Sequence, residues 1–547
     1  MSDFILVDKQ DTRYSTLQKG FNLRWPTSGN GADYIYVCHS TQDVIDAAND
    51  ALLKGNRITV RSGGHCYEGF VANKLSGEGE QPLAIIDISL MTGMIYREEG
   101  DVVSPYDQSA TYKFSLSSGN QNWDGYVNLY KGANRTIPGG SCYSVGAGGH
   151  ITGGGYGLLS RMHGLTVDWL SGVDILIPNT CGNGMVAKHV NLSSEGNDRD
   201  LFIACRGGGG GNFGIVLNYY FADLPVAPQK AYLLTLSYPW SDFISQDQFD
   251  NFMRAYWQWF ADNDADWNSA DLAKANGGLF ALLKVQHRST GDINLVVQYT
   301  GINGTVGGIQ DQPFVDFVNT MNAAAGFTPQ VRHEIRLHGA LRGDAEMSAS
   351  KGHPVKDARL MDWLYLTQTI NGSGDNQRGK YKSCYQKAQF GQRELDTLWN
   401  YLNITGRPEM NQMLVQFDSY GGCVNVNDEI NNPTSVFQRS SLLKAQFQIY
   451  WKDYNDDEMF IGWMQGFYAA YFAEFGGKPM LGDNYEGCYI NYPDIDMKYT
   501  DESRYTVDKN WLRLYYGDKS TQLIATKNNV DPHNIFRNEL SIPLIKP

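Results

Sequence analysis

The 547-residue sequence has little positive charge and no long apolar run. Lys and Arg total 45 against 59 Asp and Glu, which gives a formal net charge of −14. Nucleic acids and anionic membrane surfaces are bound through clustered Lys and Arg, so we expect neither as a partner. No apolar run approaches the ~18 residues of a membrane span. Residues 1–11 show neither the basic nor the apolar region of a signal peptide, so a cytoplasmic location is the default expectation.

Paired metal-binding cysteines are also missing. The eight cysteines form no C-x-x-C pair, which argues against a zinc or redox motif, and we expect no metal site. A chain of this length does not need disulfides for its stability, so most cysteines are expected to be small buried hydrophobic residues, Cys66 included. Internal repeats and long linkers are absent as well, and no pattern indicates an oligomeric state.

Glycine and tyrosine are abundant, at 59 and 33 residues, and the glycines are clustered. They concentrate in Arg61–Tyr67, Pro138–Gly157 and Arg206–Leu217. So much glycine costs backbone entropy on folding, and exposed N–H groups of such turns suit a pyrophosphate. A flexible linker would not intersperse Cys, Val, His and Ile among the glycines. Residues 209–214 match G-x-G-x-x-G, but a strand-like segment follows instead of a helix, which argues against a Rossmann site.

Hydrophobic periodicity predicts a mixed α and β chain. An α/β start is expected, with a helix over 41–55 capped by Thr41 between two strands, and with further buried strands at 83–89 and 172–177. From about 230 to 450, helices such as 247–262 alternate with strands such as 280–287, which indicates a second domain. The polar tail is expected to return to the first domain. The predicted domains are 1–225, 226–497 and 498–547.

Nine segments resemble the FAD-linked oxidases of the berberine-bridge-enzyme and vanillyl-alcohol-oxidase group, in particular its hexose oxidase and carbohydrate oxidase members. The resemblance covers nearly the whole chain. It implies an α+β fold with a PCMH-type FAD-binding domain and a substrate domain whose antiparallel sheet is flanked by helices. The segments are Gly20–Trp25, Ser62–Glu68, Gly139–Val145, Met162–Gly172, Ile370–Gly374, Gln377–Ser383, Glu486–Asp494, Asp531–Arg537 and Ser541–Pro543.

The resemblance places FAD at the glycine-rich segments and attaches it twice. His65 corresponds to the residue that bonds the flavin 8α-methyl group, and Cys142 to the residue that bonds flavin C6. Val145 corresponds to a residue beside flavin C4a, where a small side chain leaves a path for O2. The remaining residues implied to bind the cofactor are Arg61, Ser62, Gly63, Gly64, Gly139, Gly140, Ser141, Gly146, Gly149, His150, Gly153, Gly155, Ile215 and Asn491.

On the substrate side, the resemblance makes Tyr492 the catalytic residue and Asp418 its carboxylate partner. A free tyrosine has a pKa of about 10 and is a poor base at neutral pH. We therefore hypothesise that Tyr492 takes the proton of a sugar C1 hydroxyl and passes it directly to Asp418. The products would be a lactone and hydrogen peroxide. Residues implied to line the substrate site are Tyr67, Tyr156, Gln416, Tyr420, Gln448 and Tyr489, with Gln446 as a competitor of Gln448.

Two other functions stay open. Tailoring oxidases that act on the sugar of a natural-product glycoside share this pattern, and they carry Tyr at the position of Tyr156, where some hexose oxidases carry Asp. A flavin-free carbohydrate-binding protein would also keep the fold. The presence of both His65 and Cys142 argues against the second alternative.

Overall fold

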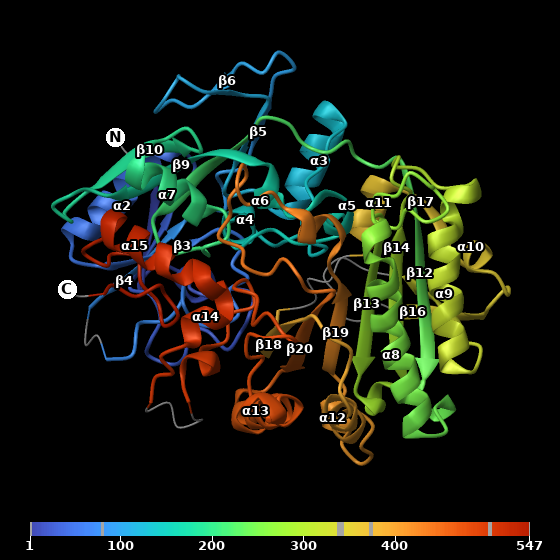
Figure 1. The fold of residues 1–547 in the computed structure, drawn as a ribbon. Coiled ribbons are helices and arrows are strands. Elements are labelled where there is room, and N and C mark those ends of the chain that lie inside the picture. Colours follow the sequence, from blue (N-terminus) through green and yellow to red (C-terminus); the bar gives the residue numbers. More distant parts are fainter. Residues whose placement is uncertain (1–2, 78–80, 336–343, 371–375, 501–505, 546–547) are drawn as a thin grey trace.

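A computed structural model describes residues 3–77, 81–335, 344–370, 376–500 and 506–545, so most of the segment Ile370–Gly374 lies outside the described residues. The chain forms two lobes (Figure 1). The first lobe contains two sheets, and the second is built on one large antiparallel sheet, as the α+β prediction required. The first lobe also has a short helix and a two-stranded hairpin, namely α1 (Tyr14–Leu17), β6 (Val102–Val103) and β7 (Thr111–Tyr112).

The first sheet of the first lobe follows the predicted strand–helix–strand start. Helix α2 (Thr41–Leu53) connects two of its parallel strands. The N-cap of this helix is Ser40 and not Thr41: the Ser40 hydroxyl accepts from the backbone N–H of Asp43, whose carboxylate accepts from the backbone N–H of Ser40. The strand order is β1 (Ile5–Asp8), β2 (Tyr34–Val37), β4 (Leu83–Asp87) and β3 (Arg57–Arg61).

The second sheet of this lobe is antiparallel and five-stranded. The glycine run that begins at Arg206 leads into strand β11, in agreement with the argument against a Rossmann site. The strand order is β10 (Met185–Asn191), β9 (Leu170–Pro178), β11 (Ile215–Phe221), β8 (Phe114–Ser117) and β5 (Met94–Tyr96). The accompanying helices are α3 (Asn122–Ala133), α4 (Ala147–Thr152), α5 (Ser160–His163), α6 (Thr166–Trp169) and α7 (Gly196–Cys205).

The second lobe is a nine-stranded antiparallel sheet with helices packed along it (Figure 1). Successive side chains of a strand point to opposite faces, so apolar residues can pack on the helices while alternate polar residues face the first lobe. The strands in order are β16 (Asp344–Ala349), β15 (Gln330–Ile335), β12 (Lys230–Pro239), β14 (Asp292–Tyr299), β13 (Leu279–Gln286), β19 (Met413–Ser419), β20 (Leu443–Trp451) and β18 (Arg378–Gln386), with β17 (Arg359–Asp362) paired to β12. The helices are α8 (Gln246–Asn263), α9 (Gln312–Ala325), α10 (Pro354–Asp357), α11 (Trp363–Thr369), α12 (Gln392–Leu402) and α13 (Asp457–Tyr471).

The C-terminal segment packs against the first lobe. Helices α14 (Trp511–Tyr516) and α15 (Ser520–Val530) lie on that side of the molecule, and α15 contacts α7 (Figure 1). Phe536 packs in the core around the first sheet, and the Arg57 guanidinium donates to the carbonyl of Arg537 at 3.0 Å. Within the described part of the chain, no helix combines the length and the apolar character needed to cross a membrane.

Candidate active site

A cavity of about 420 Å³ is lined by both lobes and by the C-terminal segment. Its wall combines the loops after β3 and around α4, the ends of the 206–214 glycine run, and the polar face of β13, β19 and β20. Most residues implied by the family resemblance line it. These are Arg61, Ser62, Gly63, Gly64, His65, Tyr67, Gly140, Ser141, Cys142, Val145, Gly146, Gly149, His150, Tyr156, Ile215, Gln416, Asp418, Gln448, Tyr489, Asn491 and Tyr492, together with Gln446.

Two glycine-containing loops meet backbone to backbone at one end of this cavity. A Cβ atom on Gly63 would lie 2.2 Å from the amide nitrogen of Gly146, and a Cβ atom on Gly146 would lie 2.2 Å from that of Gly63. Only glycine permits so close an approach, because any side chain would overlap the opposite backbone. The contact brings main-chain groups of both loops to the cavity wall, which fits the phosphate end of a dinucleotide.

His65 and Cys142 line the cavity from these two loops. Burial lowers the pKa of His65 to about 4, so its imidazole is neutral near pH 7. The His65 ring stacks on Phe21 with centroids 4.1 Å apart, and its Nε2 lies 2.9 Å from the hydroxyl of Ser144. The carbonyl of Cys142 accepts from the side-chain amide of Asn122 at 3.0 Å. The His65 side chain and the Cys142 backbone are therefore held by neighbouring groups.

His150 lies on helix α4 and is held in its neutral form. Its Nε2 accepts the backbone N–H of Gly140 at 3.0 Å. Burial, followed by the charge of Lys444, lowers the pKa of His150 to about 4. The carbonyl of the same residue accepts from the amide of Asn491 at 2.9 Å. His150 thus joins the glycine loop to the segment that carries Tyr492.

Tyr492 and Asp418 line the cavity, and Lys444 contacts both of them from behind the wall. Strands β19 and β20 pair Asp418 directly opposite Lys444, and the Lys444 ammonium lies 2.7 Å from the Asp418 carboxylate. The same ammonium donates to the hydroxyl of Tyr492 at 3.1 Å. Among the described residues, Tyr492 and Asp418 share no hydrogen bond. The hypothesis of direct proton transfer from Tyr492 to Asp418 is therefore wrong in its geometry, because Lys444 stands between them.

Lys444 is also enclosed by aromatic rings. Its ammonium lies 4.4 Å from the ring centre of Tyr492, 4.5 Å from that of Tyr156 and 5.4 Å from that of Tyr489. Such contacts between an ammonium and aromatic faces are attractive. Burial, and then the charge of Asp418, raise the pKa of Tyr492 well above its ordinary value. The resting state is therefore a neutral phenol beside an ammonium–carboxylate pair.

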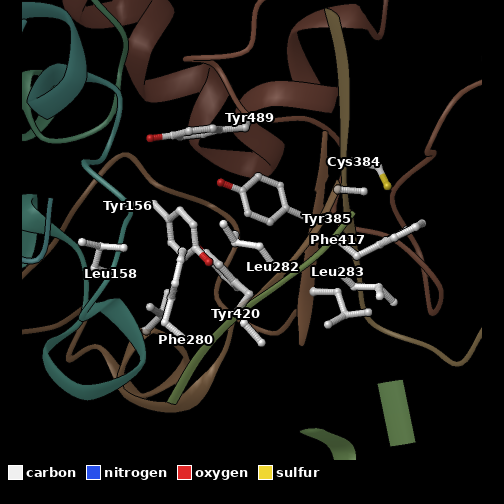
Figure 2. Packing of buried hydrophobic residues seen from close by; sticks show 14 of the residues in the cluster. Tyr156, Leu158, Phe280, Leu282, Leu283, Cys384, Tyr385, Phe417, Tyr420 and Tyr489 are labelled. Carbon is white, nitrogen blue, oxygen red and sulfur yellow. The ribbon is translucent and has the colours of Figure 1, made fainter. Parts of the chain in front are cut away.

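Figure 2 shows Tyr156 and Tyr420 in the buried cluster, and these two tyrosines differ in whether they line the cavity. Tyr156 lines the cavity with its ring, but its hydroxyl donates to the carbonyl of Ser419 at 2.5 Å. Tyr420 does not line the cavity, in contrast to the prediction. It is fully buried behind Tyr156, with ring centres 5.3 Å apart, and its hydroxyl donates to the carbonyl of Gln438 at 3.0 Å.

A ladder of glutamine side chains continues the polar face away from Lys444. Gln448 donates to Gln446 at 2.8 Å, and Gln446 donates to the hydroxyl of Tyr67 at 3.1 Å. On β19, the strand next to β20, the Gln416 side chain donates to Asp418 at 2.6 Å. Both competing residues, Gln446 and Gln448, therefore lie on the same wall. Neutral amides in this arrangement can donate to and accept from hydroxyl groups of a ligand.

Three of the implied cofactor residues do not line the cavity and instead allow close packing behind it. Gly153 leaves room for Asn491, since a Cβ atom there would lie 2.0 Å from the Asn491 amide oxygen. Gly155 has φ +75° and abuts Thr166, and a Cβ atom on Gly139 would lie 3.1 Å from the Tyr126 hydroxyl.

Several cavity residues were not predicted from the sequence. Lys444, which contacts the lining residues Asp418 and Tyr492 from behind, was not predicted either, and the alternation Lys444, Gln446, Gln448 within an otherwise apolar strand was the signal that could have revealed it. The tail was expected to pack on the first lobe, yet it also forms part of the wall. Other unpredicted lining residues are Asn122, Asn212, Tyr450, Phe536, Arg537 and Asn538. No group of three metal-ligating side chains occurs among the residues that the structure describes.

Comparisons of the sequence and the fold with known proteins identify related oxidases. A family model described as "Berberine and berberine like" matches residues 488–543. The chain is 35% identical to hexose oxidase of Chondrus crispus over 98% of this chain and 94% of that protein. It is 31% identical to the aclacinomycin-N/aclacinomycin-A oxidase of Streptomyces galilaeus over 98% of this chain and 89% of that protein. A solved glycopeptide hexose oxidase in complex with teicoplanin superimposes with a TM-score of 0.80, at 27% identity and 99% coverage of both chains.

Proposed function

The chain belongs to the berberine-bridge-enzyme-like family of FAD-linked oxidases, and on that basis we propose that it oxidises the C1 hydroxyl of a hexose or an oligosaccharide to the lactone, with O2 reduced to hydrogen peroxide. One observation carries the proposal. Tyr492 and Asp418 line the same cavity as His65 and Cys142, and Lys444 contacts both Tyr492 and Asp418, so the proposed proton acceptor and the proposed attachment residues share one chamber.

Family membership implies FAD as the cofactor. The close contact between the 63 and 146 loops suits the phosphates, and the neutral His65 imidazole suits attachment to carbon. We infer that His65 and Cys142 each bond the flavin, which would hold it permanently in a wide cavity. The bound FAD supplies the acceptor for the hydride that leaves C1 and passes the electrons to O2.

Tyr492 is the group that receives the C1 hydroxyl proton in this proposal. Tyr492 can accept that proton only as the phenolate, which forms when the phenol first releases its own proton to solvent, and the raised pKa of Tyr492 makes this release unfavourable. The Lys444 ammonium at 3.1 Å stabilises the negative charge of the phenolate oxygen. Asp418, at 2.7 Å from that ammonium, holds the lysine in place.

The glutamine ladder supplies substrate contacts. Gln446, Gln448 and Gln416 present amides toward the cavity beside Tyr67. A sugar ring carries several hydroxyl groups that both donate and accept, and neutral amides match them without demanding a charge on the substrate. We propose that these side chains orient the ring so that C1 lies near Tyr492.

A natural-product glycoside is the second candidate substrate. Tyr156, the residue that tilts the sequence toward tailoring oxidases, lines the cavity, and one 31% identical relative is named as an aclacinomycin oxidase. The Tyr156 hydroxyl is occupied by the Ser419 carbonyl, however, so the residue contributes a ring wall instead of a second proton acceptor. That arrangement leaves Tyr492 as the acceptor and favours a single oxidation of a simple sugar.

Peroxide release tests the proposal. The purified protein is mixed with glucose, galactose, maltose, lactose and cellobiose in a peroxidase-coupled assay, with a Tyr492→Phe variant as the matched control. Peroxide from the parent protein and not from the variant supports a carbohydrate oxidase. If none of the sugars bleaches the flavin under anaerobic conditions, carbohydrate oxidation is refuted and glycosylated natural products become the next substrates to test.

A further inference from the structure

Outside the proton-accepting centre, five charged side chains gather behind the edge strand β18. The Lys380 ammonium lies 2.8 Å from Glu68, 2.6 Å from Asp494 and 3.1 Å from Asp496. The Lys382 ammonium lies 2.6 Å from Asp494 and 2.8 Å from Asp496. Lys380 is fully buried, and Glu68 and Asp494 are nearly so. This group is called the Lys380 cluster below.

The Lys380 cluster joins two cavity loops that are far apart in the sequence. Glu68 is three residues beyond His65 and belongs to the loop that leaves β3. Asp494 is two residues beyond Tyr492. Lys380 contacts both carboxylates, whereas Lys382 contacts Asp494 without reaching Glu68. Lys380 therefore connects the loop after β3 to the segment that carries Tyr492 through two ion pairs.

A second set of contacts reinforces the same connection. The side-chain amide of Asn22 donates to the carbonyl of Tyr67 at 2.9 Å and to the carbonyl of Gly379 at 3.1 Å. Trp25 donates to the Tyr67 carbonyl at 3.0 Å, and Arg24 donates to the Gly379 carbonyl at 3.1 Å. Residues 20–25 and 377–383 resemble family segments but had no assigned chemistry, and here they converge with residues 486–494 on one point beside the cavity.

Stability does not account for this arrangement. Removing five charged groups from water is costly, and well-packed apolar residues of similar volume are often at least as stable as a buried ion pair. Directional ion pairs do specify geometry, because each carboxylate must lie within hydrogen-bond distance of the ammonium. The cluster thus fixes where one loop sits relative to the other.

We propose that Lys380 is a positioning residue: by holding Glu68 and Asp494 together, it sets the place of Tyr492 relative to the loop that carries His65 and Tyr67. The inference rests on the proposed function for its kinetic part. Proton and hydride transfer depend steeply on geometry, and a displacement of about 1 Å costs roughly 100-fold in rate. Loosening the connection should therefore slow flavin reduction by sugar without abolishing cofactor attachment.

The variants are chosen to separate positioning from stability. Lys380→Met removes the connection and leaves the buried Glu68 carboxylate without its ion-pair partner, while Asp494 and Asp496 keep Lys382. The double variant Lys380→Met, Glu68→Gln also lacks the connection, but it has no unpaired charge at position 68. The melting temperature of the double variant should therefore recover toward that of the parent protein. Lys382→Met is the matched control, since it removes a buried lysine from the same strand and leaves the Glu68–Lys380–Asp494 bridge intact.

Anaerobic stopped-flow mixing of each flavin-loaded variant with cellobiose gives the kinetic readout. We expect flavin reduction to fall about 10- to 100-fold in both variants that lack Lys380, and less than about threefold in Lys382→Met. Reoxidation of the reduced protein by O2 should not change, because it does not require the C1 proton to be accepted. Recovery of the reduction rate together with the melting temperature in the double variant would overturn the proposal.

Hydrogen exchange tests the connection without any substrate. In Lys380→Met, the backbone amides of 65–68 and 489–494 should exchange faster together, while Lys382→Met should affect only 489–494. An effect of Lys380→Met on one loop alone refutes the positioning role, even if no sugar reduces the parent protein. Absence of sugar reduction in the parent, with coupled exchange in Lys380→Met, would instead refute the proposed function and keep the connection.

Discussion

The replacement Lys444→Met gives the sharpest test of the candidate active site. Lys444 is fully buried, ion-pairs with Asp418 at 2.7 Å and donates to the Tyr492 hydroxyl at 3.1 Å. Methionine keeps an unbranched apolar side chain of similar length but has neither the charge nor the donors. The change therefore removes one positive charge beside Tyr492 and Asp418 and leaves the shape of the cavity unchanged.

Stability and chemistry should respond separately. Breaking a buried ion pair by removing one partner costs about 3–5 kcal/mol, because the remaining carboxylate stays buried without compensation. Adding Asp418→Asn should restore much of that loss, since the stranded charge is removed as well. The chemical effect should persist in the double variant, because loss of one preorganised donor at a developing negative oxygen costs about 100- to 1,000-fold in rate.

The pH dependence provides a second signature of the same lysine. Burial and Asp418 both raise the pKa of Tyr492, whereas a neighbouring ammonium opposes them. Without Lys444, negative charge on the Tyr492 oxygen is less stable. The pH at which the sugar-dependent rate rises should therefore move upward in Lys444→Met.

Anaerobic stopped-flow measurements with cellobiose between about pH 6 and pH 10 report both effects. Lys382→Met serves as the control, since Lys382 is also a buried, ion-paired lysine of this sheet but pairs with Asp494 and Asp496 instead of Asp418. If Lys444→Met reduced its flavin at the parent rate, with an unshifted pH profile, the assignment of Lys444 as the group that stabilises Tyr492 would be wrong.

Three further predictions concern the proton acceptor, the attachment residues and the glycine contact. Tyr492→Phe removes the hydroxyl that accepts the proton, so flavin reduction by sugar should fall about 100- to 10,000-fold in stopped flow while the protein stays yellow. His65→Ala or Cys142→Ala alone should leave the flavin in the acid-precipitated pellet, whereas the double replacement should release it into the supernatant, and a colourless pellet from either single variant would argue against two attachments. Gly146→Ala places a Cβ atom 2.2 Å from a backbone nitrogen of the facing loop, so the melting temperature and the flavin content should both fall, whereas Gly462→Ala, whose Cβ atom meets nothing within 4 Å, should change neither.

Local rules predicted the elements of this chain well. The strand–helix–strand start, the strand after the 206–214 glycine run and the return of the tail to the first lobe all follow from hydrophobic periodicity and turn chemistry, which act over a few neighbouring residues. The one local error, a cap at Thr41 instead of Ser40, is a shift of one residue between two hydroxyl side chains that can both cap a helix.

Motif resemblance also predicted much of the cavity wall, including His65, Cys142, Asp418 and Tyr492. It failed where a role depends on which way a side chain turns. Tyr420 was expected at the cavity and lies behind it, because its hydroxyl is satisfied by a backbone carbonyl instead of facing a ligand. Nothing in the order of residues distinguishes a tyrosine that lines a wall from one that supports it.

The sequence by itself therefore determined the family and the two-lobed α+β architecture, since these follow from contiguous segments. Only the tertiary structure decided that Lys444 separates Tyr492 from Asp418 and that Lys380 joins Glu68 to Asp494. The reason is physical. Both contacts arise from strand register and from loops that are hundreds of residues apart in the sequence. The interaction energy of a buried charge also depends on the groups that surround it, and a local sequence pattern does not contain that information.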